Sequence, residues 1–201
     1  MKSAEHPSTS RQYRKTTRAE AERATGEAIL DAAFNAFSSE SFDRVTLQAI
    51  ADKSGVTVQT VIRRFGSKEE LFETLIEREK PRILASRESA DGEGLATALR
   101  ALLEHYETDG DTVLNFLAQE HRVACVRNVV DEGRRIHREW VERHCADLLE
   151  AAGHDRDTVL EAAIAATDLY TWKLLRRDRG LELQRVHTVM MRMVNGLKRR
   201  Q

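Results

Sequence analysis

Helix-breaking and cross-linking residues are scarce in this sequence. Of its 201 residues, 2 are proline and 10 are glycine, and aromatic side chains make up only 5%. A turn-rich β-sandwich needs more of these residues, so the composition favours long helices and an all-α fold. The two cysteines, Cys125 and Cys145, are too few for a disulfide scaffold and lack metal-ligand spacing with one another.

Long hydrophobic runs are also missing. No window approaches the ~18 uninterrupted apolar residues of a membrane span, and the polar, basic N-terminal stretch lacks the apolar segment of a signal peptide. We therefore expect a cytoplasmic protein without a membrane partner. Hydrophobic residues still make up 41% of the chain, which is enough for a core. No nucleophile–base pair, phosphate-binding loop or carboxylate pair on a rigid turn is recognisable, so we expect neither an enzyme nor a bound cofactor.

Charge is distributed unevenly, although the formal net charge is only -1. Residues 1–18 contain five basic residues and one acidic residue, and residues 53–68 contain four basic residues and no acidic one. Five glutamates follow between positions 69 and 79. Screening confines such local fields to about 8–10 Å, so the two basic segments predict local contacts with a polyanion. An ordinary solvated charge pattern is the alternative.

The patterned segments predict three parts. Residues 1–20 are rich in Ser, Thr, Arg and Lys without an apolar period, so we expect a flexible basic arm. Residues 21–67 predict a small three-helix domain, whose first helix runs from about Glu22 to Ser39, and residues 68–201 predict a larger helical bundle. Turn-forming residues around positions 91–94, 109–111, 131–133, 153–155 and 180 divide this bundle into expected helices at 94–107, 111–128, 132–152, 156–178 and 182–198.

Residues 46–68, TLQAIADKSGVTVQTVIRRFGSK, carry the most informative pattern. Thr46 is a good N-cap for a short helix, and Gly55 can supply a left-handed turn after it. Thr57 then opens a second short helix. Two short helices joined by such a turn predict a helix-turn-helix motif.

The residues around this motif support close packing of its helices. The small side chain of Ala51 permits a close helix crossing, and Val61 provides an apolar contact from the second helix. Ser67 and Glu70 match a capping box, which predicts the start of a further helix. We expect Pro81 to end or kink that helix.

The outer face of the second short helix carries hydroxyl, amide and guanidinium groups but no carboxylate. It comprises Thr57, Val58, Gln59, Thr60, Arg63 and Arg64. Such side chains can donate to and accept from base edges in a DNA major groove while binding phosphate. The alternative, two packed helices of an ordinary bundle, does not need an acid-free outer face.

The segment AILDAAFNAFSSESFDRVTLQAIADKSGVTVQTVIRRFGSKEELFETLI resembles the DNA-binding domain of the TetR family of bacterial transcriptional regulators. A second stretch, AATDLYTWKLLRRDRG, resembles the penultimate helix of many members of this family. The site residues implied by the resemblance are Thr46 and Gln48, which contact DNA, Val58, Gln59 and Thr60, which face bases, and Lys68, which holds a phosphate.

Two positions of the second short helix depart from the family pattern. Ile62 stands where the family usually has tyrosine, and Arg64 stands where it has an aromatic residue or histidine. Those family side chains commonly grip the DNA backbone, and isoleucine cannot form a hydrogen bond. We infer that Arg63 and Arg64 take over, which would change the preferred operator sequence.

Groove geometry predicts a two-fold dimer. One short recognition helix covers few base pairs, so two such helices must lie about one DNA turn, ~34–36 Å, apart. The last two expected helices carry apolar residues at seam spacing that can pack against a partner: Leu160, Ile164, Thr171, Leu174, Leu183, Val186, Met190, Met193 and Leu197. Because the spacing does not distinguish packing within a chain from packing between chains, monomer core is the alternative.

The resemblance further implies that residues 68–201 bind an unknown small-molecule effector and form a homodimer. The implied function is ligand-responsive regulation of transcription, most often repression, at a palindromic operator on double-stranded DNA. Candidate pocket residues are Tyr106, Phe116, His137, Trp140 and Trp172, although a single aromatic residue here is more often core. The alternative function is a redox- or metal-sensing regulator that uses Cys125, Cys145, His137 and His144.

Overall fold

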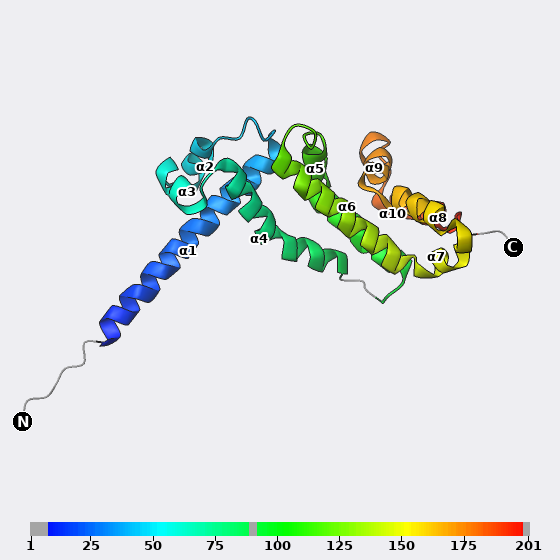
Figure 1. Cartoon of the computed structure of the whole chain (residues 1–201), viewed down its shortest axis with the longest axis horizontal. Helices are drawn as coiled ribbons and strands as arrows, with labels where there is room; N and C mark the ends of the chain where they lie inside the picture. The colour runs from blue at the N-terminus through cyan, green and yellow to red at the C-terminus, as the bar shows by residue number, and fades with distance from the viewer. Residues whose placement is uncertain (1–7, 89–91, 199–201) are drawn as a thin grey trace, which may run out of the picture. The chain divides into compact units, whose positions relative to one another are not determined.

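The computed structural model describes residues 8–88 and 92–198, and within these ranges the chain is helical and contains no β-strand (Figure 1). The all-α prediction is therefore confirmed. Two compact units divide the chain after Leu75. No helix within the described ranges is both long enough and apolar enough to cross a membrane.

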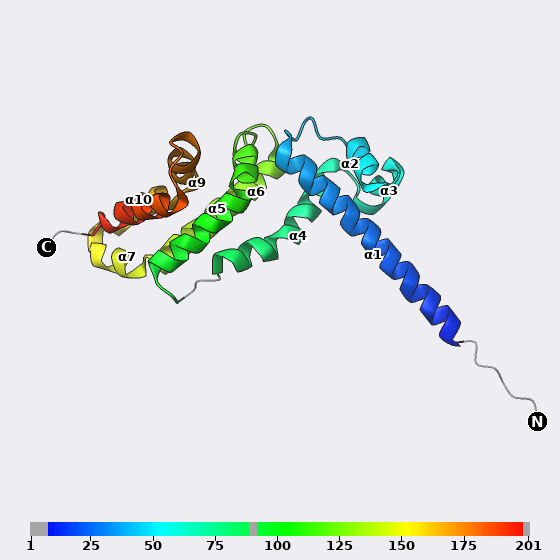
Figure 2. The ribbon, with the colours of Figure 1, turned by 180° about the vertical axis from the view of Figure 1, so that it is seen from behind.

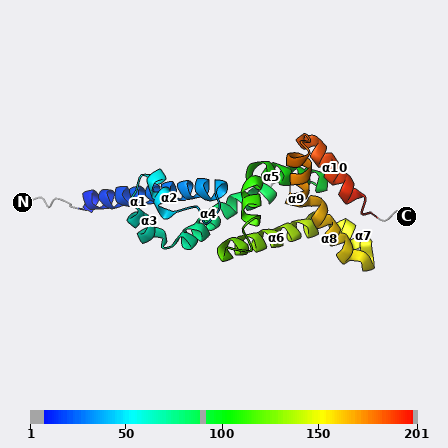
Figure 3. The same cartoon turned by 90° about the horizontal axis from the view of Figure 1, so that it is seen from above.

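The first unit contains three helices and the start of a fourth. Its helices are α1 (Ser8–Ser39), α2 (Leu47–Ser54), α3 (Val58–Phe65) and the first turns of α4 (Lys68–Glu88). Helix α2 packs against α1, and α3 packs against α2, while the N-terminal turns of α1 extend beyond both short helices (Figure 3). The predicted helix-turn-helix is therefore present at the expected position.

An aromatic cluster forms part of the core of the first unit. The ring centroids of Phe37 and Phe42 lie 5.3 Å apart, and Phe72 meets them edge-on at 5.1 and 5.6 Å. Such edge-to-face pairs add stabilisation beyond the buried area alone. Apolar side chains from all four helices complete the core: Ile29, Ala33, Ile50, Ala51, Val61, Leu71 and Leu75.

The first helix is longer than the sequence pattern predicts. It begins at Ser8 and not near Glu22, so residues 8–20 of the expected flexible arm are helical. That stretch contains no proline or glycine, although Ser, Thr and basic residues dominate it. A helix anchored in the core from Ile29 onward can propagate through such residues without an apolar face. Residues 1–7 of the expected arm lie outside the described residues.

The second unit is a helical bundle in which α5 and α6 lie side by side (Figure 2). It begins with the remainder of α4 and continues with α5 (Leu95–Leu117), α6 (Ala124–His144), α7 (Ala146–Ala152), a 3-10 turn (Gly153–Asp155), α8 (Arg156–Thr167), α9 (Leu169–Trp172), a π-helical segment (Lys173–Asp178) and α10 (Leu183–Asn195). Helix α4 continues through Pro81, so the expectation that this proline could end the helix is wrong.

Two of the expected turns lie inside helices. Residues 109–111 belong to α5 and residues 131–133 belong to α6. Gly110 is buried against the ring of Trp172, where a Cβ atom would lie 2.8 Å from two ring carbons. This glycine therefore permits close helix packing and does not form a turn. The connection between α5 and α6 lies instead at residues 118–123, which contain no glycine or proline to mark it.

The two longest expected helices are also interrupted. The segment expected at 132–152 changes from α6 to α7 at Cys145, and the segment expected at 156–178 breaks at Asp168. Asp168 has an extended backbone, and its carboxylate accepts a hydrogen bond from the amide of Tyr170 at 2.8 Å. An aspartate that caps the following helix competes with continuation of the preceding one. The spacing of apolar residues in the sequence does not reveal such a cap.

Candidate functional site

The helix-turn-helix is held by capping interactions at both short helices. Thr46 Oγ1 accepts a hydrogen bond from the amide of Ala49 at 3.1 Å, and Thr57 Oγ1 accepts one from the amide of Thr60 at 3.3 Å. Gly55 adopts a φ of 69°, the left-handed conformation that the turn between the helices requires. Both N-caps and the turn were predicted from the sequence and are confirmed.

Helix α3 turns its apolar side inward and its polar side outward. Val61 is fully buried, whereas Gln59 and Arg63 are exposed and Thr60 is half-buried. The hydroxyls of Thr57 and Thr60 lie 3.0 Å apart and share a hydrogen bond. No acidic residue lies on this helix. The exposed face therefore offers hydrogen-bond donors and acceptors to a polyanion without electrostatic repulsion.

The two departures from the family pattern have different surroundings. Ile62 is 42% exposed, so its apolar side chain faces solvent on α3. The guanidinium of Arg64 lies directly against Gly26 of α1, where a Cβ atom would come within 2.3 Å of Nη2. Arg64 therefore lies against α1, yet it is exposed, as Arg63 is. The sequence does not reveal this contact because it joins residues far apart in the chain.

Lys68 forms two hydrogen bonds inside the first unit. Its Nζ donates to the carbonyl oxygens of Phe42 at 2.8 Å and Val45 at 3.1 Å, and it lies 4.4 Å from the ring centroid of Phe42. A lysine ammonium has three N–H donors, so one remains for a phosphate. Lys68 thus stabilises the loop between α1 and α2, and its phosphate contact stays a prediction. Gln48, also expected to contact DNA, is exposed and donates to Asp52 at 2.7 Å.

The residues expected to line an effector pocket are mostly core residues. Tyr106 donates its hydroxyl to the carbonyl of Thr167 at 3.1 Å, and Nε2 of His137 lies 3.2 Å from Thr167 Oγ1. Trp172 is completely buried and donates Nε1 to Glu107 at 2.9 Å. Phe116 is also buried.

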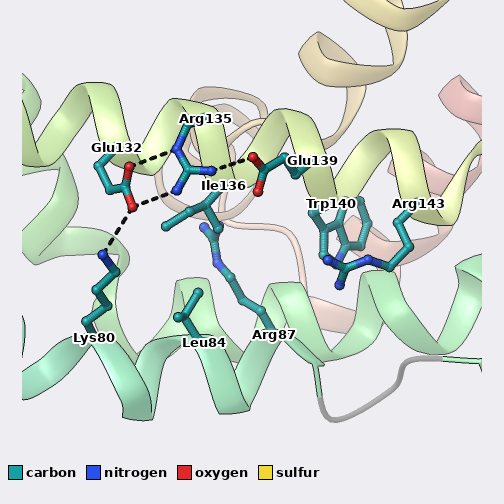
Figure 4. Close-up of a pocket in the computed structure, with 9 residues that line it drawn as sticks. All are labelled: Lys80, Leu84, Arg87, Glu132, Arg135, Ile136, Glu139, Trp140 and Arg143. Carbon is teal, nitrogen blue, oxygen red and sulfur yellow. Dashed lines mark hydrogen bonds and ion pairs between the residues drawn. The ribbon is translucent and has the colours of Figure 1, made fainter.

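A cavity of about 210 Å³ lies between α4 and α6 (Figure 4). Of the five expected pocket residues, Trp140 alone contributes to its lining. The other lining residues were not predicted, because their charged side chains resemble an ordinary solvated helix face in the sequence. The lining comprises Lys80, Leu84, Arg87, Glu132, Arg135, Ile136, Glu139, Trp140 and Arg143.

The cavity has an excess of positive charge. Four basic side chains line it against two carboxylates. Glu132 accepts hydrogen bonds from Arg135 at 2.7 and 2.9 Å and pairs with Lys80 at 3.2 Å. These contacts, above all those from Arg135, lower the pKa of Glu132 to about 2. Arg135 also bonds Glu139, so both carboxylates of the lining are already paired (Figure 4).

Two buried donors at this cavity have no hydrogen-bond partner within the described residues: Nε of Arg87 and Nε1 of Trp140. Trp140 is only 3% exposed. The positive charge of Arg87 also affects the pKa of a histidine in the neighbouring core. Burial, followed by the positive charge of Arg87, lowers the pKa of His137 to about 4, so His137 is neutral near pH 7.

The residues of the expected redox or metal site do not come together. Cys125 lies in α6 and Cys145 follows its end, twenty residues later, which corresponds to about 30 Å along a helix. Burial raises the pKa of the Cys145 thiol to about 11, which disfavours the reactive thiolate. His137 and His144 flank the ring of Trp140 at 6.0 and 4.8 Å. Among the described residues, no group of three or more potential ligands could hold a metal ion.

The expected dimer seam divides into core and surface. Leu160, Val186 and Met190 are completely buried and form part of the core of the second unit. The prediction that they lie in a subunit interface is therefore wrong. Leu174 is 52% exposed and Met193 is 43% exposed. The remaining seam residues are half-buried: Ile164, Thr171, Leu183 and Leu197. Tyr170 is 55% exposed, lies near Leu174 in the chain and was not among the predicted seam residues.

Within the second unit, ion pairs attach α4 to its neighbours. Arg82 donates to Asp109 of α5 at 2.8 and 3.2 Å, and Nδ1 of His105 lies 3.0 Å from the same carboxylate. Burial acts to raise the pKa of Asp109, but the contacts with His105 and Arg82 outweigh it and lower this pKa to about 2. Movements of α4 within this unit must therefore be accommodated by α5 and α6.

Comparison with known proteins supports this geometry. Residues 29–75 match the family model of bacterial regulatory proteins, tetR family. No curated protein matches the chain significantly.

Solved structures share the fold over most of the chain. A transcriptional regulator from Rhodococcus sp. Rha1 aligns with a TM-score of 0.65 and 15% identity, covering 86% of this chain and 95% of that one. A transcriptional regulator from Aquifex aeolicus VF5 aligns with a TM-score of 0.61 and 20% identity, covering 87% and 98%. A TetR-like regulator from Rhodococcus sp. RHA1 aligns with a TM-score of 0.64 and 22% identity, covering 86% and 95%.

Proposed function

Since the chain belongs to the tetR family of bacterial regulatory proteins by the match over residues 29–75, we propose that it is a homodimeric transcriptional repressor, which binds a palindromic operator and releases it when a small molecule occupies the second unit. The observation that carries this proposal is the exposed, acid-free face of α3, held in position by the capped helix-turn-helix.

Base readout is assigned to residues on this face. Gln59 offers an amide that can pair with adenine, and Arg63 offers a guanidinium that can bind guanine bidentately. Thr46 and Gln48, with Thr57, Val58 and Thr60, supply the remaining contacts to bases and backbone. Lys68 has one N–H left for a phosphate, and Arg64, which is exposed although it lies against Gly26, adds positive charge to the same motif.

Dimerisation is assigned to the exposed apolar side chains of the second unit. Tyr170, Leu174 and Met193 are more than two-fifths exposed, and a partner subunit packed on them would remove apolar surface from water. A two-fold dimer formed through this surface would supply the two recognition helices that successive major grooves of a palindrome require.

Ligand control is assigned to α4, the helix that runs through the boundary between the two units. Its start contains Lys68, and its second half lines the cavity and forms ion pairs with α5 and α6. A ligand can release DNA only if it binds more tightly to the conformation that binds DNA poorly.

Selection of DNA from a random pool with the full-length protein tests this proposal. The expected result is a palindrome whose half-sites are centred about 10–10.5 base pairs apart, or a multiple of that distance. Gln59→Ala and Arg63→Ala should each weaken operator binding by about 1–3 kcal/mol and relax base preference. Arg138→Ala, a matched arginine change on α6, should have no effect. Equal losses on operator and random DNA for both α3 variants would contradict base readout.

A further inference from the structure

Two buried donors line the cavity between α4 and α6 without an acceptor in the described part of the chain. The two carboxylates of the cavity are already paired with Lys80 and Arg135. The guanidinium nitrogen Nε of Arg87 and the indole nitrogen of Trp140 are buried without a hydrogen-bond partner within the described residues. A buried donor without an acceptor costs free energy comparable to a lost hydrogen bond, and more when it is charged. A ligand that carries an acceptor would satisfy these donors, and the basic lining favours a negatively charged one.

The remainder of the lining is apolar. Leu84, Ile136 and the ring of Trp140 contribute hydrocarbon and aromatic surface beside the basic groups (Figure 4). An inorganic anion would leave this surface without a contact, whereas an organic anion would bury its own apolar part there. The volume of about 210 Å³ lies below the range of roughly 300–1,000 Å³ that drug-sized ligands occupy, so the ligand is small.

We propose that this cavity binds a small organic monocarboxylate, whose carboxylate accepts hydrogen bonds from Arg87 and Trp140 and whose apolar part lies against Leu84 and Ile136. Arg143 adds positive charge at the same end of the cavity as Trp140 (Figure 4). This inference rests on the proposed function in one respect: the carboxylate is the effector that controls operator binding.

Calorimetry with the full-length protein tests the ligand class without any variant. The probes are phenylacetate, indole-3-acetate and octanoate, each compared with its neutral primary amide, and inorganic phosphate. At least one carboxylate should bind about tenfold or more tightly than its amide, because a charged acceptor forms stronger hydrogen bonds than a neutral one. Phosphate should bind more weakly than that carboxylate. Equal affinities for acid and amide, or binding of phosphate alone, would overturn the proposal, as would failure of every carboxylate to bind.

Three charge variants locate the binding site. Arg87→Gln should weaken the carboxylate about tenfold or more, through loss of a charge-assisted hydrogen bond. Glu139→Gln should tighten it, because this change makes the lining more positive. Arg138→Gln removes an arginine of α6 that pairs with Glu142 and Glu161 outside the cavity, and it should change the affinity less than about twofold. Circular dichroism identifies any variant that fails to fold. Equal effects of Arg87→Gln and Arg138→Gln would place the ligand elsewhere.

A gel-shift assay with the selected operator separates the two proposals. Release of DNA by the bound carboxylate supports both. Tight carboxylate binding that leaves operator affinity unchanged keeps the site and overturns its role as effector. Operator binding by a protein that binds no carboxylate keeps the DNA-binding function and overturns the ligand class.

Discussion

Gly110 is the position at which a single methyl group gives the clearest test of packing in the second unit. In Gly110→Ala, the new Cβ atom would lie 2.8 Å from two ring carbons of Trp172 and 3.3 Å from Cδ1 of Leu169. The ring cannot move aside easily, because Trp172 is completely buried and its Nε1 is bonded to Glu107. Overpacking of this kind costs about 1–3 kcal/mol.

Helix propensity acts in the opposite direction. Replacing a mid-helix glycine by alanine stabilises a helix by roughly 0.5–1 kcal/mol when nothing else changes. Gly133 supplies the matched control, because it lies within α6 and a Cβ atom there would meet nothing within 4 Å. We therefore expect Gly133→Ala to raise the free energy of unfolding by this amount. The difference between the two variants isolates the steric cost, about 1–3 kcal/mol.

Urea unfolding followed by tryptophan fluorescence measures this difference in the free energy of unfolding of the second unit. The chain has two tryptophans, Trp140 and Trp172, and both lie after Leu75. The midpoint for Gly110→Ala should fall below that of the unmodified protein or stay close to it, while the midpoint for Gly133→Ala rises. Equal stabilisation by both substitutions would refute a close contact between α5 and Trp172.

Three further predictions concern the first unit and the response to pH. Lys68→Ala should lower the thermal stability of the protein as well as its affinity for DNA of any sequence, because Nζ bonds the loop carbonyls of Phe42 and Val45; a loss of affinity without a loss of stability would show that these bonds contribute little. Deleting residues 1–18, which carry five basic residues and one acidic residue, should reduce the salt dependence of DNA binding without altering the selected sequence, and an unchanged salt slope would exclude an electrostatic contact. The pKa of His137 is lowered from 6.5 to about 4, so the unfolded chain binds more protons between these values, and the free energy of unfolding should decrease as the pH falls from 6.5 toward 4; denaturation of His137→Gln should show a weaker decrease.

Features set by neighbouring residues were predictable from the sequence. The N-caps at Thr46 and Thr57, the turn at Gly55 and the capping box of Ser67 and Glu70 depend on side chains within four residues of the groups they bond. The outward face of α3 followed from the same local pattern. Each of these predictions is confirmed because local geometry leaves few alternatives.

Features set by distant residues were not predictable. Gly110 stands between two aspartates, as a turn residue often does, and only its contact with the ring of Trp172 explains its place inside α5. The apolar spacing of α10 cannot distinguish the buried Met190 from the exposed Met193, because both fit a helical seam. The cavity was missed for a related reason: paired arginines and glutamates on one helix look like a solvated surface until a second helix covers them.

The contact between Gly26 and Arg64 links the substitutions that these two positions can accept during evolution. A side chain larger than hydrogen at position 26 would displace the guanidinium from α1, and a shorter side chain at position 64 would leave the glycine surface uncovered. A change at either position therefore alters the packing that a change at the other can affect. Among sequences descended from a common ancestor with this chain, glycine at position 26 and a long side chain at position 64 should be retained or lost together.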